Sequence, residues 1–148
     1  MKRKKSILLV EDNKHDQLFF INALREIENV LLYDIANNGA EALDILANAV
    51  ILPDLIFMDI NMPVMNGVDC LAEINKNPRT KNIPVVILSS AKEKVEAVRE
   101  LGAKAFLEKQ WDHKVRRSQL EQMIHLDFTA DSHLANQTFQ TGYLAYYS

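Results

Sequence analysis

The chain has 148 residues, of which 48% are hydrophobic and 25% charged, and its formal net charge is −3. This length and composition fit one globular domain, and the near balance of charge gives no indication of direct nucleic-acid binding. No apolar run reaches the ~20 residues that span a bilayer, and no secretory signal follows the basic residues 2–5. Cys70 is the single cysteine. It can form no intramolecular disulfide, so we expect a cytoplasmic protein without membrane association.

Short apolar runs alternate with longer amphipathic stretches along the chain. In chain order we expect a strand at 6–10, a helix near 15–27 with Leu18 on its apolar face, a strand at 31–35, a turn at 38–39, a helix at 42–49, a strand at 55–58, a helix at 68–74, a strand at 85–88, a charged helix near 92–101, a strand at 105–107 and a helix near 113–126.

The expected strands are continuously apolar, which indicates a parallel sheet covered by helices on both faces. Right-handed crossovers then favour a doubly wound α/β fold. Residues 127–148 are rich in polar and aromatic side chains. We interpret residues 1–126 as one domain and 127–148 as a tail that is too short to form an output domain.

Polar side chains follow the expected strands, at the edge where open α/β sheets bind ligands. These residues are Glu11, Asp12, Asp59, Asn61, Ser90 and Lys109. Any one of them alone would more often be a helix cap or a solvated charge. Their joint placement at successive strand ends predicts a functional site.

Such a set of side chains has a chemical logic. Clustered carboxylates repel one another unless a cation lies between them, and a few hard oxygen ligands with room for water suit Mg²⁺. A carboxylate beside that ion can attack a phosphoryl group in line. An ammonium group and a hydroxyl can then bind the transferring oxygens.

Four segments together resemble the receiver domains of response regulators in two-component signalling. They are LLVED at 8–12, MDINMPVMNG at 58–67, PVVILSSA at 84–91 and GAKAFLEK at 102–109. Each segment alone has low specificity, but the combination is specific and covers about residues 6–110.

The resemblance implies a flavodoxin-like five-stranded sheet with strand order 2-1-3-4-5. It also implies that Asp59 is the phospho-acceptor, that Glu11 and Asp12 bind Mg²⁺ with Asp59, and that Asn61 adds its backbone carbonyl. Lys109 would bind the phosphate.

Ser90 and Phe106 would form the switch of such a receiver, with Phe106 moving inward on phosphorylation. The usual phosphodonor is a phosphohistidine on a sensor histidine kinase or a phosphotransfer protein. A downstream protein target would bind the face made by the helix at 92–101, the strand at 105–107 and the helix at 113–126, near Lys104, Phe106 and Trp111.

Two residues depart from the family pattern. The aromatic switch position holds Phe106, where many relatives have tyrosine, and Gln110 follows Lys109, where relatives commonly have a proline with a cis bond. A cis bond costs ~0.5–1 kcal/mol before proline but ~2.5–4 kcal/mol before another residue. We therefore predict a trans peptide at Lys109–Gln110 and a loop at 110–113 that differs from the family.

Two other functions compete with the phosphorylation switch. A magnesium phosphatase with an aspartate nucleophile generally carries a second carboxylate two residues later, and here that position is Asn61. A non-phosphorylated adaptor with the same fold is favoured by Gln110 alone. We therefore expect no enzyme beyond self-catalysed phosphorylation and dephosphorylation. For Lys92, shielding of the phosphate and simple solvation stay equally open.

Overall fold

The computed structural model describes residues 3–126 and 128. It confirms a five-stranded parallel sheet in the order β2-β1-β3-β4-β5. The elements are β1 (Lys5–Val10), α1 (Lys14–Leu24), β2 (Val30–Ala36), α2 (Gly39–Asn48), β3 (Leu55–Met58), α3 (Gly67–Lys76), β4 (Val85–Ser89), the short 3₁₀ helix η1 (Lys92–Lys94), α4 (Val95–Glu100), β5 (Ala105–Glu108) and α5 (His113–Ile124).

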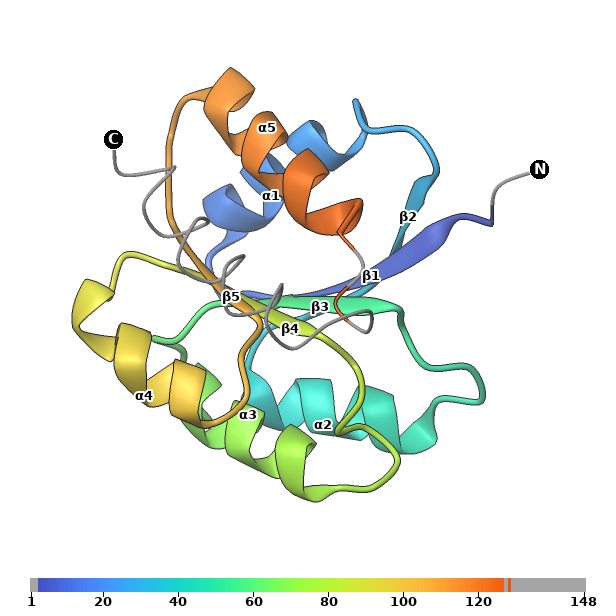
Figure 1. Ribbon diagram of the computed structural model, residues 1–148, viewed down its shortest axis with the longest axis vertical. Helices are drawn as coiled ribbons and strands as arrows, with labels where there is room; N and C mark the ends of the chain where they lie inside the picture. Colours follow the sequence, from blue (N-terminus) through green and yellow to red (C-terminus); the bar gives the residue numbers. More distant parts are fainter. Residues whose placement is uncertain (1–2, 127, 129–148) are drawn as a thin grey trace.

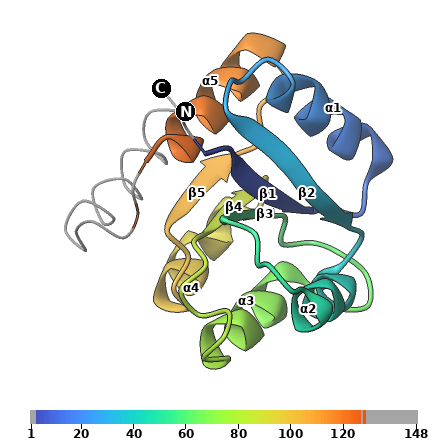
Figure 2. The same ribbon diagram turned by 90° about the vertical axis from the view of Figure 1, so that its right-hand side faces the viewer.

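Helices cover both faces of the sheet. Figures 1 and 2 show α1 and α5 on one face and α2, α3 and α4 on the other. Successive strand residues point to opposite faces, so Ile7 and Leu9 pack beneath α1 and α5 while Leu8 and Val10 pack beneath α2, α3 and α4. Both faces of the central strands are buried, which explains why β3 is apolar throughout and β1 is apolar from Ile7 to Val10.

Asparagine side chains start three of the helices. The side chains of Asn13, Asn38 and Asn66 each accept a hydrogen bond from a backbone N–H in the first helical turn. The predicted turn at Asn38–Gly39 was therefore wrong, because Gly39 is the first residue of α2. A Cβ atom on Gly39 would lie 2.8 Å from the Cβ of Cys70 in α3, so glycine lets the two helices approach.

The predicted apolar face of the segment 15–27 was wrong at Leu18, although Leu24 and Ile27 further along it are buried as predicted. Leu18 is 58% exposed, whereas Gln17 is buried. The Gln17 side chain donates to the backbone carbonyl of Glu11 and to the side chain of Asn37. Because these bonds turn Gln17 inward, its neighbour Leu18 points to solvent.

The predicted tail at 127–148 lies outside the described residues except for Phe128. That ring is 9% exposed and packs in the layer beneath α1 and α5. In residues 3–126, no helix combines the length and the apolar character needed to cross a bilayer.

Candidate functional site

The acidic residues predicted at the strand ends come together in the structure. Glu11 and Asp12 follow β1, Asp59 follows β3, and carboxylate oxygens of the three residues all lie within 4.8 Å of one another. Glu11 and Asp59 are only 4% and 8% exposed, while Asp12 is half-buried. The parallel sheet explains this meeting, since neighbouring strands end at the same edge.

Lys109, at the end of β5, reaches into this cluster. Its Nζ lies 2.8 Å from Oε1 of Glu11 and 3.0 Å from Oδ2 of Asp59. The lysine side chain is 8% exposed. The predicted pairing of an ammonium group with the acidic cluster is therefore present in the folded chain.

A fourth carboxylate, from Asp16, belongs to the site and was missed by the sequence analysis. Its Oδ2 lies 2.6 Å from Nζ of Lys109, the shortest of the three contacts of that ammonium group. Asp16 lies in the first turn of α1, four residues after Asp12. The sequence does contain a signal for Asp16. It follows Asp12 by about one helical turn, and the first turn of a helix lies close to the strand end that precedes it.

Burial and charge shift two of these groups in opposite senses. Burial, reinforced by the charge of Asp59, raises the pKa of Glu11 to about 7, although hydrogen bonding to Lys109 opposes the shift. Burial alone would lower the pKa of Lys109, but hydrogen bonds to Asp16 and Glu11 and the charge of Asp59 raise it above its usual value. Lys109 therefore stays protonated, but its single positive charge does not neutralise all the acidic side chains around it.

Backbone contacts fix the position of Asp59. Its N–H donates to the carbonyl of Val10 at 3.0 Å, and its Oδ1 accepts the N–H of Ile60 at 2.7 Å. Gly67 begins α3 directly against this peptide: a Cβ atom there would lie 2.1 Å from the carbonyl oxygen of Asp59. Only glycine allows so close an approach.

The remaining predicted residues are placed differently. Asn61 and Ser90 are exposed in the loops after β3 and β4. Ser89, directly before Ser90, is buried, and its Oγ accepts the N–H of Ala91. Phe106 is fully buried beneath α2, α3 and α4, so the structure describes the inward position of this ring.

Three further predictions concern residues around the end of β5. The Lys109–Gln110 peptide is trans, as predicted. Trp111, expected near the face of α4, β5 and α5, lies two residues before α5, and its ring lies 5.5 Å from the ring of Phe19 in α1. Lys92, whose role stayed open, pairs with Glu108 at 3.1 Å.

A divalent cation fits this set of donors. Glu11, Asp12 and Asp59 offer carboxylate oxygens close enough to share one ion, and hard oxygen ligands of this kind are those of Mg²⁺ or Mn²⁺. The four carboxylates of the site, with Asp16, exceed the charge of Lys109. Burial is the main cause of the raised pKa of Glu11, and the charge of Asp59 adds to it; a bound cation would relieve this repulsion between the two carboxylates.

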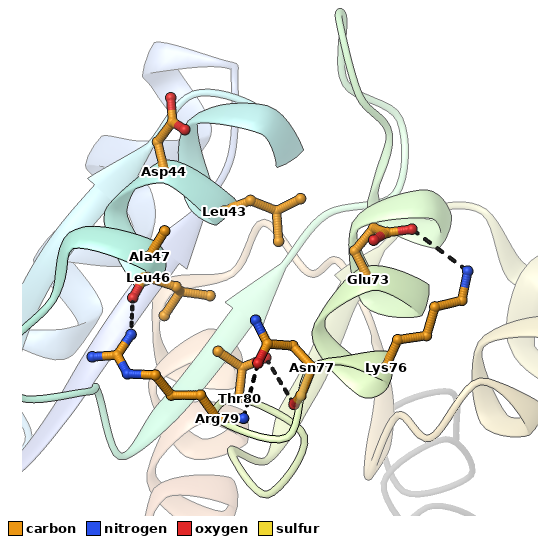
Figure 3. Close-up of a pocket in the computed structure, with 9 residues that line it drawn as sticks. All are labelled: Leu43, Asp44, Leu46, Ala47, Glu73, Lys76, Asn77, Arg79 and Thr80. Atoms are coloured by element: carbon orange, nitrogen blue, oxygen red, sulfur yellow. Dashed lines mark hydrogen bonds and ion pairs between the residues drawn. The ribbon is translucent and has the colours of Figure 1, made fainter.

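Another hollow lies at the opposite edge of the sheet. A cavity of about 420 Å³ is lined by residues of α2, of α3 and of the segment after α3. Figure 3 shows these residues. Arg79 borders it and donates to the carbonyls of Leu46 and Ala49, which end α2. These hydrogen bonds pair backbone carbonyls that the end of a helix leaves without a partner, so Arg79 has a structural role. None of the residues that line the cavity belongs to the acidic site.

Comparison with known proteins agrees with this geometry. The family model of the response regulator receiver domain matches residues 7–125. Response regulator Rcp1 of Synechocystis is 36% identical over 114 residues, which are 71% of this chain and 76% of Rcp1. Sensor histidine kinase CheAY of Helicobacter pylori is 28% identical over 82% of this chain, but the match spans only 15% of that kinase.

Solved structures show the same fold. The phosphorylated cyanobacterial phytochrome response regulator RcpA superposes with a TM-score of 0.71 at 30% identity, covering 81% of this chain and 91% of RcpA. Mn²⁺-bound Rcp1 gives 0.71 at 32% identity, covering 80% and 91%. CheY of Borrelia burgdorferi, in complex with CheX, BeF₃ and Mg²⁺, gives 0.69 at 26% identity, covering 80% and 89%.

Proposed function

Because this chain belongs to the response regulator receiver domain family, we propose that it is a phosphorylation switch whose phospho-acceptor is Asp59. The observation that carries the proposal is the contact of Asp59 with Lys109 at 3.0 Å inside a cluster of acids at the sheet edge. A buried carboxylate beside a fixed ammonium group is ready to act as a nucleophile toward a phosphoryl group, whose oxygens the ammonium then binds.

The phosphodonor is a phosphohistidine of a sensor histidine kinase or a phosphotransfer protein. A carboxylate oxygen of Asp59 forms the new O–P bond while the N–P bond breaks, and the electron pair of that bond returns to the imidazole nitrogen. Lys109 binds the phosphoryl oxygens and balances their charge. Two similar proteins, CheAY of Helicobacter pylori and histidine kinase P4 of Formosa agariphila, are themselves named as histidine kinases, which supports this class of donor.

Mg²⁺ is the proposed cofactor. Glu11, Asp12 and Asp59 would hold it through carboxylate oxygens, and Asn61 through its backbone carbonyl. When bound, the ion neutralises negative charge on the phosphoryl oxygens. The Mn²⁺-bound form of Rcp1 supports a divalent cation in a related receiver.

The phosphorylated domain signals through a protein partner. Ser90, exposed at the end of β4, donates its hydroxyl hydrogen to the phosphate, and Phe106 keeps its inward position. Phosphorylation replaces the single negative charge of the Asp59 carboxylate by the ~2 negative charges of the phosphoryl group. It shifts the population of states only through contacts that differ between them. The proposed docking face consists of α4, β5 and α5.

The test is the mass of the intact protein after incubation with acetyl phosphate and Mg²⁺. Wild type should gain one phosphoryl group, and EDTA should abolish the gain. Asp59→Asn, which keeps the shape but removes the nucleophile, should gain nothing. Asp44→Asn, an exposed carboxylate on α2, should behave like wild type. Equal labelling of Asp59→Asn and wild type would contradict the assignment, and no labelling of any form would favour the adaptor.

A further inference from the structure

Helix α5 presents two buried polar side chains to the segment after β5. Arg116 is 1% exposed and Gln119 is 0% exposed. Burying a guanidinium group is unfavourable unless it is well bonded, and burial lowers the pKa of Arg116 to about 10 despite the nearby charges of Asp16 and Glu11. Two such residues, one helical turn apart, require a physical explanation.

Both side chains bind the backbone on either side of Lys109. Nε2 of Gln119 donates to the carbonyl of Glu108 at 3.1 Å, and Nη2 of Arg116 donates to the carbonyl of Gln110 at 3.0 Å. The residue between these carbonyls is the lysine that contacts the acidic cluster. Its own N–H is bound as well, by a carbonyl of β4 at 3.1 Å.

Arg116 is itself held between two aromatic rings. Its guanidinium carbon lies 4.8 Å from the ring centroid of Phe19 and 5.6 Å from that of Trp111. The two rings contact each other edge to face. Cation–π contacts of this kind contribute ~0.5–2 kcal/mol, and here they join α1, the loop after β5 and α5 around the carbonyl of Gln110.

Stability alone does not explain these side chains. Among the described residues, Nε of Arg116 and Oε1 of Gln119 are buried without a hydrogen-bond partner. Replacing both partners of a buried polar contact by apolar groups of the same shape is often neutral or stabilising, so incompletely satisfied polar side chains are a poor means of stabilising a fold. A role in the geometry of the site explains their presence better.

We infer that Arg116 and Gln119 are positioning residues for Lys109, an inference that rests on the proposed function of that lysine. The lysine ammonium group lies at the end of a flexible four-carbon stem, so the backbone from which it starts decides where it can reach. Glutamine at position 110 leaves φ free, which proline would fix. The two hydrogen bonds from α5 supply the missing constraint and direct the ammonium group toward Asp59.

The experiment measures single-turnover phosphorylation by acetyl phosphate at saturating Mg²⁺, as a function of donor concentration. Gln119→Met removes one hydrogen bond and keeps an apolar side chain of similar length. Arg116→Met does the same but also removes a positive charge and its cation–π contacts, which makes Gln119→Met the cleaner variant. Arg117→Met is the matched control, because Arg117 is the next residue on α5 and is exposed. Thermal melts and Mg²⁺ affinity are recorded for every variant.

We expect Arg116→Met and Gln119→Met to lower the rate constant at saturating donor by about tenfold, within the ~10²-fold that a 1 Å misplacement produces. Their melting temperature should fall by a few degrees, because each variant leaves a backbone carbonyl without its partner, but their Mg²⁺ affinity should stay close to that of wild type. Arg117→Met should match wild type in all three measurements. In a Lys109→Ala background, Arg116→Met should lower the rate no further, because the two residues act through one ammonium group.

Three results decide the inference. Wild-type rates for both Arg116→Met and Gln119→Met overturn it, and so does an equal loss of rate from Arg116→Met with and without Lys109. If Lys109→Ala and Asp59→Asn both keep the wild-type rate, the proposed function fails and the positioning role fails with it. If Arg116→Met yields no folded protein, the result for Gln119→Met decides alone.

Discussion

Replacing Gly67 by alanine should damage the site far more than the fold. The added Cβ atom would lie 2.1 Å from the carbonyl oxygen of Asp59, where ordinary contact begins near 3.4 Å, so one of the two must move by about 1.3 Å. Overpacking of this kind lowers the free energy of unfolding by ~1–3 kcal/mol. The higher helix propensity of alanine offsets up to ~1 kcal/mol of that loss. A shift of 1 Å at a reacting group costs ~10²-fold in rate.

The assay is the rate of phosphorylation by acetyl phosphate for each folded variant, with thermal melts beside it. Gly39→Ala is the matched control, because its Cβ atom would meet Cys70 and Met65 at 2.8 Å and not the peptide of Asp59. Both variants should lose stability, but only Gly67→Ala should lose most of its rate. The reasoning is refuted if Gly67→Ala melts and reacts like wild type.

Three further predictions concern charge. Asp12→Ala should weaken Mg²⁺ binding in a titration without lowering the melting temperature in EDTA, since like charges there repel without a cation. A lower melting temperature in EDTA would contradict it. Burial alone would raise the pKa of Asp54, but hydrogen bonds from Ser6 and Arg3 and the charge of Arg3 together outweigh it and lower the pKa below 3.8. The stability advantage of wild type over Asp54→Asn, followed by denaturant melts, should therefore be complete at neutral pH and shrink below about pH 3.8; an advantage that persists in strong acid would oppose it. Lys92→Ala should leave the decay of phosphorylated protein unchanged, because Lys92 pairs with Glu108; faster decay would restore the shielding role.

Most of the sheet and the acidic cluster could be predicted from the sequence. Buried parallel strands are apolar throughout, so the runs ending at Val10, Met58 and Leu88 are recognisable without a partner strand. The strand order and the meeting of Glu11 with Asp59 followed from the resemblance and from parallel topology, because the carboxyl ends of the strands share one edge.

What could not be predicted depends on polar side chains that point inward. Apolar periodicity assigns such residues to the surface, yet Gln17, Arg116 and Gln119 are buried because they bind backbone carbonyls. For this reason Leu18 was wrongly placed on the buried side of α1 and Gln17 was overlooked. The position of Trp111 beside Phe19 has the same origin, since Arg116 holds both rings and no local pattern reports a contact between α1 and α5.

The most direct test of the central claim locates the phosphoryl group on the chain. Wild type is phosphorylated with acetyl phosphate and Mg²⁺, the acyl phosphate is reduced with borohydride to homoserine, and the peptides are sequenced by mass spectrometry. The account predicts homoserine at position 59, the residue whose Oδ2 lies 3.0 Å from Lys109, and none at positions 12 or 16. Homoserine at another position, with aspartate intact at position 59, would contradict the account.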